Sequence, residues 1–198
     1  MKLPSIIILA GLLFSLNACS PSETPEATEP GGPIAALMGN PIPPAMKHQA
    51  GSLIFGALTD LYKQQHDIKA TPEEIDQFLN SSVFKEMDDR NTSALQDQQM
   101  AVGFIVSWKV NKALYDQYGG RISMQQFGPE PIDGYLGLIA DHKKQGTFVF
   151  YDPAVEADFM NFFTNQSVAH TITESQEEAD KMMSAPFWVN FRSTKPSP

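Results

Sequence analysis

The sequence predicts a mainly α-helical protein, a compact bundle of about five to six helices around one long central helix at residues 93–118. From Ala94 to Tyr118 the chain has no proline and only one glycine, Gly103. Apolar residues in this stretch recur at steps of one, three, four and seven, which places them on one side of a helix. A glycine pair at 119–120 follows and predicts where the helix ends.

Two helices are expected before the central one. Residues 47–66 carry apolar side chains at positions i, i+1, i+4, i+5, i+8 and i+9, which is the spacing of an amphipathic helix. Thr71, Pro72 and Glu74 form the pattern of a capping box with proline in the first helical turn. A second helix is therefore expected to begin there.

After the central helix, further helical segments alternate with short extended ones. Helical spacing returns at residues 132–144, 153–165 and 173–183, the last opened by Thr173 as its N-cap. Residues 121–127 are either a short strand or an extended connection, whereas residues 147–151 (TFVFY) favour a strand. If both are strands, we expect 121–127 to pair with 147–151 in a two-stranded ribbon that lies on the helices.

The first nineteen residues have the features of an export signal. Met1-Lys2 supplies a positive charge, and the apolar run at residues 6–16 is too short for a comfortable membrane-spanning helix. The run ends at Leu16-Asn17-Ala18-Cys19, which resembles the lipobox of bacterial lipoproteins. This resemblance implies cleavage between Ala18 and Cys19, acylation of Cys19 with palmitate-type chains, and attachment to the cell membrane or outer membrane facing the periplasm. The alternative is a plain signal peptide with a stray cysteine; we favour lipidation because the cysteine is the only one and lies where the apolar run stops.

The predicted organisation has four parts: a signal peptide (1–18), a lipid anchor with a proline-rich tether (19–46), a single helical domain (47–192) and a tail (193–198). Residues 20–33 are rich in Pro, Glu, Ser and Thr, so we expect a disordered or extended tether. Residues 34–46 mix apolar residues with prolines. They are either an extended apolar strap laid on the domain or a free linker.

The composition excludes several classes of protein. The net charge is −9 and no basic run is present, which argues against nucleic-acid binding. One cysteine allows no internal disulfide. The four histidines have no metal-ligand spacing, and no phosphate-binding loop, dinucleotide fingerprint or nucleophile elbow is present. We therefore expect neither a metal nor a cofactor.

One polar cluster is a candidate site. Arg121 is followed by Gln125, Gln126 and Glu130, and an arginine beside paired amides can grip a carboxylate or a peptide backbone. The alternative is structural: a helix end followed by a turn, with Arg121 paired to an acid. The structural interpretation is the commoner one for so short a motif.

Residues 53–79 carry a second resemblance. Leu53-Ile54, Leu58, Leu61 and Ile68, followed by Thr71-Pro72-Glu73-Glu74-Ile75, are similar to the N-terminal helical module of SurA-type periplasmic chaperones. The chain lacks the surroundings of a parvulin signature, so prolyl isomerase activity is not implied. The resemblance implies a helical body that binds peptides without a catalytic unit.

The function that we favour is non-catalytic binding of other envelope polypeptides, as a chaperone-like protein or an assembly factor. Aromatic and methionine side chains suit adaptable apolar recognition. The candidate contacts are Phe187 and Trp188, with Phe159 and Phe163 as further candidates. A core position is the alternative, and it suits Phe159 and Phe163 better than the other two.

Two other functions stay open. The protein could hold a small ligand in a cavity between helices, or serve as an envelope scaffold. It could also be an enzyme that uses Arg121 with Glu130, Asp133 or His170, if those side chains converge in one cleft.

Overall fold

The computed structural model describes residues 31–86, 93–125, 128–165, 171–173 and 175–190. Helices make up 66% of these residues, which confirms the mainly α-helical fold. The elements in chain order are β1 (Ala35–Leu37), β2 (Asn40–Ile42), the 3-10 helix η1 (Pro44–Gln49), α1 (Ala50–Gln65), α2 (Pro72–Leu79), α3 (Ser82–Glu86), α4 (Ala94–Tyr118), β3 (Ile122–Gln125), β4 (Gly128–Pro131), α5 (Ile132–Lys144), β5 (Phe148–Phe150), α6 (Pro153–Thr164), β6 (Thr171–Ile172), α7 (Gln176–Met182) and α8 (Phe187–Asn190).

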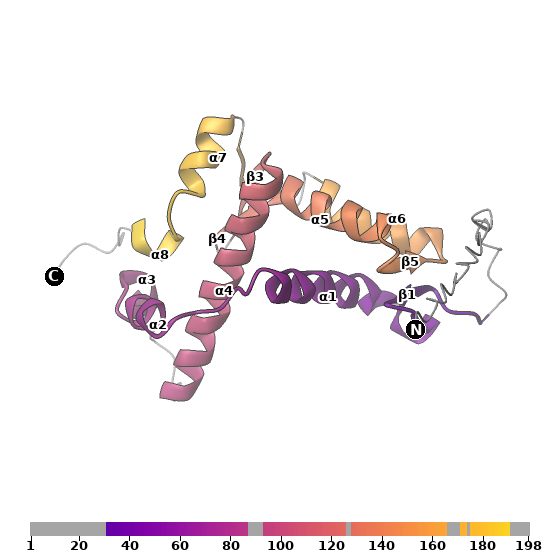
Figure 1. The fold of residues 1–198 in the computed structure, drawn as a ribbon, viewed down its shortest axis with the longest axis horizontal. Coiled ribbons are helices and arrows are strands. Elements are labelled where there is room, and N and C mark those ends of the chain that lie inside the picture. Colours follow the sequence, from indigo (N-terminus) through magenta and orange to yellow (C-terminus); the bar gives the residue numbers. More distant parts are fainter. Residues whose placement is uncertain (1–30, 87–92, 126–127, 166–170, 174, 191–198) are drawn as a thin grey trace, which may run out of the picture.

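The long helix α4 is the central element, as predicted. Ser93 and Gln96 cap its start reciprocally, and Gly119 ends it at φ 66°, a backbone angle that favours glycine. In Figure 1, α4 runs across the ends of α1 and α5, while α2, α3 and α8 lie on its other side. The predicted capping box that opens α2, between Thr71 and Glu74, is also present.

Three core clusters pack against α4. Val110 and Leu114 join the largest cluster, together with α1, α5, α6 and the strands β1 and β5. Ile105 joins a second cluster with α2, α3 and α8. Tyr115 joins a third with Ile122 and α7. Because one helix contributes to all three, its length sets the relative positions of the other elements.

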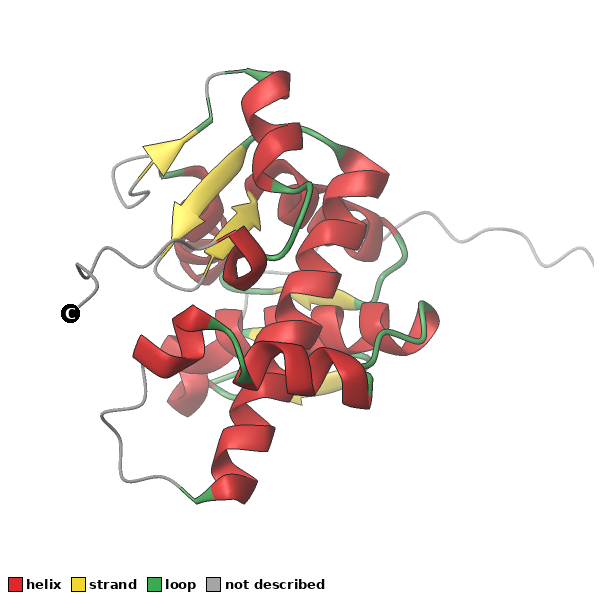
Figure 2. Ribbon diagram, turned by 90° about the vertical axis from the view of Figure 1, so that its left-hand side faces the viewer, coloured by secondary structure: helices red, strands yellow, loops and turns green. Residues whose placement is uncertain are grey.

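The strand pairing differs from the prediction. β5 pairs with β1, and β3 pairs with β4 and β6, so residues 121–127 do not pair with 147–151. The two prolines of β4 are typical of a turn, but β4 is an edge strand, where proline is tolerated. Since β4 follows β3 closely, its pairing also costs less loop-closure entropy than pairing beyond α5. Figure 2 shows the two small sheets apart from each other among the helices.

The expected strap at residues 34–46 is part of the core. β1 and β2 form a hairpin whose two turn residues, Met38 and Gly39, both have positive φ, which is the geometry of a tight hairpin turn. Ile34, Ala35 and Ile42 are buried in the largest cluster. The folded body therefore includes this segment, as expected of a strap laid on the domain.

The start of the last predicted helix is displaced. Thr173 is not its N-cap; the Thr173 hydroxyl accepts a hydrogen bond from the Ile122 amide, and its own amide donates to the Ile122 carbonyl. Ser175 caps α7 instead, by accepting from the Glu178 amide. Thr173 thereby continues the β3–β6 pairing.

Candidate functional site

Two hollows follow one side of α1, and a third adjoins them beside β3 and β4. The aromatic hollow, of about 540 Å³, lies between the first half of α1 and α6. The corner hollow, of about 1240 Å³, lies between the second half of α1 and α4. The small hollow, of about 200 Å³, lies between β3, β4 and the end of α6. Glu130 and Tyr135 line all three, so the hollows meet there, and we call them together the α1 groove.

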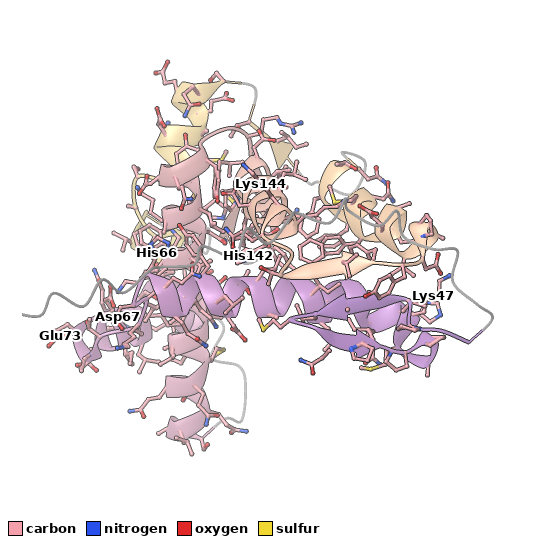
Figure 3. The ribbon with its side chains drawn as sticks, turned by 45° about the vertical axis from the view of Figure 1, so that its right-hand side comes forward. Lys47, His66, Asp67, Glu73, His142 and Lys144 are labelled. Carbon is pink, nitrogen blue, oxygen red and sulfur yellow. The ribbon has the colours of Figure 1, made fainter. Side chains whose placement is uncertain are left out.

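One face of α1 belongs to the core and another lines the groove. The buried positions are Ala50, Ile54, Leu58 and Tyr62, at steps of four. The groove-lining positions are Gly51, Ser52, Phe55, Gly56, Thr59, Asp60, Lys63 and Gln64. Both sets recur about once per helical turn, so the groove follows nearly the whole helix. In Figure 3, Lys47 marks the end of the groove before α1, and Asp67 marks the end after it.

The aromatic hollow has rings on several sides. Phe55 lies 4.9 Å from Phe163 and 5.0 Å from Tyr135, and Phe159 lies 5.3 Å from Phe163, measured between ring centroids. Tilted and edge-to-face pairs of this kind each add about 0.5–1.5 kcal/mol beyond burial, so the wall is firmly held. Phe162 lines the same hollow and is 69% exposed. An apolar ligand therefore finds both a fixed wall and an accessible ring at the opening.

A buried hydrogen-bond chain fixes the point where the hollows meet. The Tyr135 hydroxyl donates to Asn111 Oδ1 at 2.7 Å, and Asn111 Nδ2 donates to the Pro129 carbonyl at 3.0 Å. Burial, and secondarily the charge of Glu130, raises the pKa of Tyr135, so its hydroxyl stays protonated and remains a donor. The chain ties α5 to α4 and α4 to β4, which holds β4 in place beside the groove.

Glu130 is the charged residue at this meeting point. It lies on β4 opposite Ser123 of β3, and its half-buried carboxyl lines all three hollows. Burial raises the pKa of Glu130. Within the described residues, no hydrogen bond or ion pair engages this carboxylate. A desolvated carboxylate in a hollow is the kind of group that binds a cation or takes part in proton transfer.

The nearby cations already have partners. Arg121 lines the small hollow, but its guanidinium is bidentate on Asp133, with Nε–Oδ2 at 3.1 Å and Nη2–Oδ1 at 2.7 Å. The hydrogen bond from Arg121, opposed by burial, lowers the pKa of Asp133. The lysines at the rim, Lys47, Lys63 and Lys69, each form an ion pair with an aspartate. Among the described residues, the Glu130 carboxylate is therefore left without a cationic partner.

The residues predicted as a site from the sequence are only partly brought together. Arg121, Gln125 and Glu130 line the small hollow. The Asp133 carboxylate accepts a hydrogen bond from the Arg121 amide. Gln125 donates to the Ser123 hydroxyl. The structural interpretation of Arg121 is confirmed, since its partner is an acid and Gly119 ends the helix before it. Four predicted residues, Ala18, Cys19, Gln126 and His170, lie outside the described residues.

The four aromatic candidates are buried or half-buried. Trp188 is a core residue at 5% exposure, in contact with Phe78 and Trp108, so it offers no recognition surface. Phe187 is half-buried beside Trp188 and lies against Gly128, where no Cβ would fit. α8 turns both side chains toward α2, α3 and α4, which leaves Trp188 in the core and Phe187 partly accessible. Phe159 and Phe163 are buried in the largest core cluster, as preferred, and they also line the aromatic hollow.

Sequence reasoning missed Tyr135, Asn111 and Phe55 as site residues. Asn111 carried a usable signal, because it is a polar residue between apolar positions of the central helix. A buried amide needs hydrogen-bond partners, so its position predicts a polar contact inside the fold. No comparable signal marks Phe55, whose role depends on α6 packing beside α1.

Metal and membrane sites give no further candidate within the described ranges. Those residues contain no group of three or more His, Cys, Asp or Glu that could hold a metal ion. None of the helices described is both long and apolar enough to cross a membrane. Comparisons with protein-family models, with curated proteins and with solved structures found no match.

Proposed function

We propose that the protein is an envelope lipoprotein that binds extended polypeptide segments in the α1 groove, without catalysis. The observation that carries the proposal is the length of the groove along α1. This helix has 16 residues, or about 24 Å at 1.5 Å per residue. An extended chain rises about 3.3 Å per residue, so about seven residues would fill the groove. Such a shape suits a polypeptide better than a single small molecule.

The chemistry of the groove supports the same function. Polypeptide recognition uses apolar hollows for side chains and a few polar groups that fix the register. The aromatic hollow is the apolar site for side chains, and Glu130 is the polar group that fixes the register. In this account, acylated Cys19 holds the groove near the membrane, and residues 20–33 set its reach, as the sequence predicts.

The test uses the mature, lipidated protein in nanodiscs with a permanently unfolded, reduced client protein. The wild type is expected to suppress aggregation of the client at a stoichiometric ratio. Gly56→Leu places a side chain in the aromatic hollow without a clash at Cβ, since nothing lies within 4 Å of that position, and is expected to abolish suppression. Ala140→Leu, at an exposed position of α5 outside the hollows, is the matched control. Equal suppression by wild type and Gly56→Leu, or none by the wild type, would refute the proposal.

A second candidate is a small-ligand-binding lipoprotein, which the size of the aromatic hollow favours. At about 540 Å³ it lies within the range of about 300–1,000 Å³ usual for small-molecule pockets. A ligand that co-purifies with the wild type but not with Gly56→Leu would support this candidate. The enzyme hypothesis stays open: the Arg121 guanidinium is paired with Asp133, and Glu130 lines the same small hollow.

A further inference from the structure

We propose that the α1 groove selects polypeptide segments in which a lysine or arginine lies two residues from an aromatic or large aliphatic residue, with the basic group on Glu130. This inference rests on the proposed function, since it names what the same groove prefers. It assigns a specificity residue and the chemical class of the partner.

Charge complementarity identifies the basic group. Of the residues that the structure describes, Glu130 is the only charged one that lines all three hollows, and the described cations near it are paired with aspartates. An ammonium or guanidinium group would give this carboxylate the hydrogen bonds that burial withholds. The rings of Phe55 and Tyr135 lie beside the same point and add attraction for a cation.

The arrangement of the hollows identifies the apolar neighbour. Glu130 lies where the aromatic hollow adjoins the corner hollow. In an extended chain, residues i and i+2 point to the same side and are about 7 Å apart. A basic residue on Glu130 therefore directs the side chain two positions away into the aromatic hollow, against Phe159 and Phe163. A polar residue there would lose its hydration without a partner.

The extent of the groove favours a polypeptide over a free organic cation. A small amine would occupy the meeting point and leave most of the groove in contact with water. An extended segment instead covers the aromatic and corner hollows together, along α1 from Gly51 to Gln64. The apolar contacts on both sides then hold the basic group at Glu130.

The test is a binding titration on the mature lipidated protein in nanodiscs, read by fluorescence anisotropy. The probe is a seven-residue peptide of serine and glutamine with lysine at its fourth position and phenylalanine at its sixth. The comparison peptide has norleucine, which lacks the charge, in place of lysine. Three variants accompany the wild type: Glu130→Gln, Gly56→Leu and the control Glu177→Gln, an exposed acid on α7 that lines none of the hollows.

The lysine peptide is expected to bind the wild type and Glu177→Gln about 10-fold or more tightly than the norleucine peptide, as a charge-assisted hydrogen bond requires. In Glu130→Gln the two peptides are expected to bind alike, and in Gly56→Leu neither should bind. Equal binding of both peptides to the wild type, still blocked by Gly56→Leu, would overturn the specificity inference and leave the proposed function standing. No binding of either peptide to the wild type, or no effect of Gly56→Leu, would overturn both. Displacement of the peptide by n-butylammonium at equal concentration would overturn the polypeptide as the partner.

Discussion

Removing one hydroxyl at the centre of the groove should measurably destabilise the protein. In Tyr135→Phe the ring stays, but Asn111 Oδ1 loses the donor that lies 2.7 Å away. Asn111 is only 7% exposed, so water does not readily replace that donor. A buried acceptor left without a partner costs about 1–3 kcal/mol, and we expect a loss of about 2 kcal/mol in the free energy of unfolding. For a domain of this size that corresponds to about 4–8 °C in Tm.

The assay is urea denaturation followed by circular dichroism, with Tyr135→Phe, Asn111→Leu and the double variant in one thermodynamic cycle. Because the two side chains share the hydrogen bond, the cycle should give a coupling energy of about 1 kcal/mol or more. The control is Ser107→Ala, which removes a hydroxyl from an exposed position of α4. A loss below about 0.5 kcal/mol for Tyr135→Phe, with no coupling to Asn111→Leu, would refute the hydrogen-bond chain as the support of the groove.

Three further predictions concern charge and backbone. Burial raises the pKa of Glu130 in the folded state, so ionisation of this carboxyl opposes folding. Glu130→Gln should therefore raise Tm at pH 7. The gain should vanish as the pH falls below 4.5, where the carboxyl becomes protonated in both the folded and the unfolded state. A lower or unchanged Tm at pH 7 would contradict this. Asp133→Asn should lower Tm at pH 7, because the hydrogen bond from Arg121 lowers the pKa of Asp133 in the folded state. For this partly exposed pair we expect a loss of about 1 kcal/mol in the free energy of unfolding. That loss should disappear as the pH falls through the lowered pKa. Melting curves from pH 2 to 7 check both variants. Gly103→Ala should stabilise by about 0.5–1 kcal/mol, since no atom lies within 4 Å of its Cβ. Gly120→Ala should destabilise by more than about 2 kcal/mol, since φ is +89° and the new Cβ would lie 2.5 Å from the Cβ of Asp133. Chemical denaturation of both glycine variants measures the two changes in the free energy of unfolding. Similar changes at Gly103 and Gly120 would contradict the packing described.

The opposite signs expected for Glu130 and Asp133 separate a binding residue from a structural one. Asp133 stabilises the fold through its partner, whereas the burial of Glu130 opposes folding. Proteins commonly accept such a cost at sites that bind ligands. The comparison of the two carboxyls therefore tests whether the groove is a functional feature.

The helices could be predicted from the sequence because their signals are local. The apolar spacing of α4 and the capping box at Thr71 depend only on residues within a few turns. The strands were harder, because β1, β4 and β6 have two to four residues each. In addition, β1 pairs with β5 and β6 pairs with β3 across long stretches of the chain. Prolines in β4 also gave the signal of a turn, which only its position at a sheet edge overrides.

The groove could not be predicted, because it depends on contacts between distant segments. Phe55 and Phe163 lie 4.9 Å apart in space although more than a hundred residues separate them in sequence. Glu130 was singled out from the sequence for its nearness to Arg121. In the structure Arg121 pairs with Asp133 instead, and Glu130 lines the small hollow. Exposure of Phe162 and burial of Trp188 likewise follow from how α6 and α8 pack, not from residue type.

The most direct test of the central claim, that a polypeptide lies along α1, is photo-crosslinking with the lysine-containing peptide. Its phenylalanine is replaced by benzoyl-phenylalanine, and the attachment point on the mature lipidated protein is mapped by mass spectrometry. The account predicts attachment to the walls of the aromatic hollow, at residues 51–56 of α1 or 159–163 of α6. Attachment at Leu95, or at Phe187 and Trp188, with none on those two segments would contradict it.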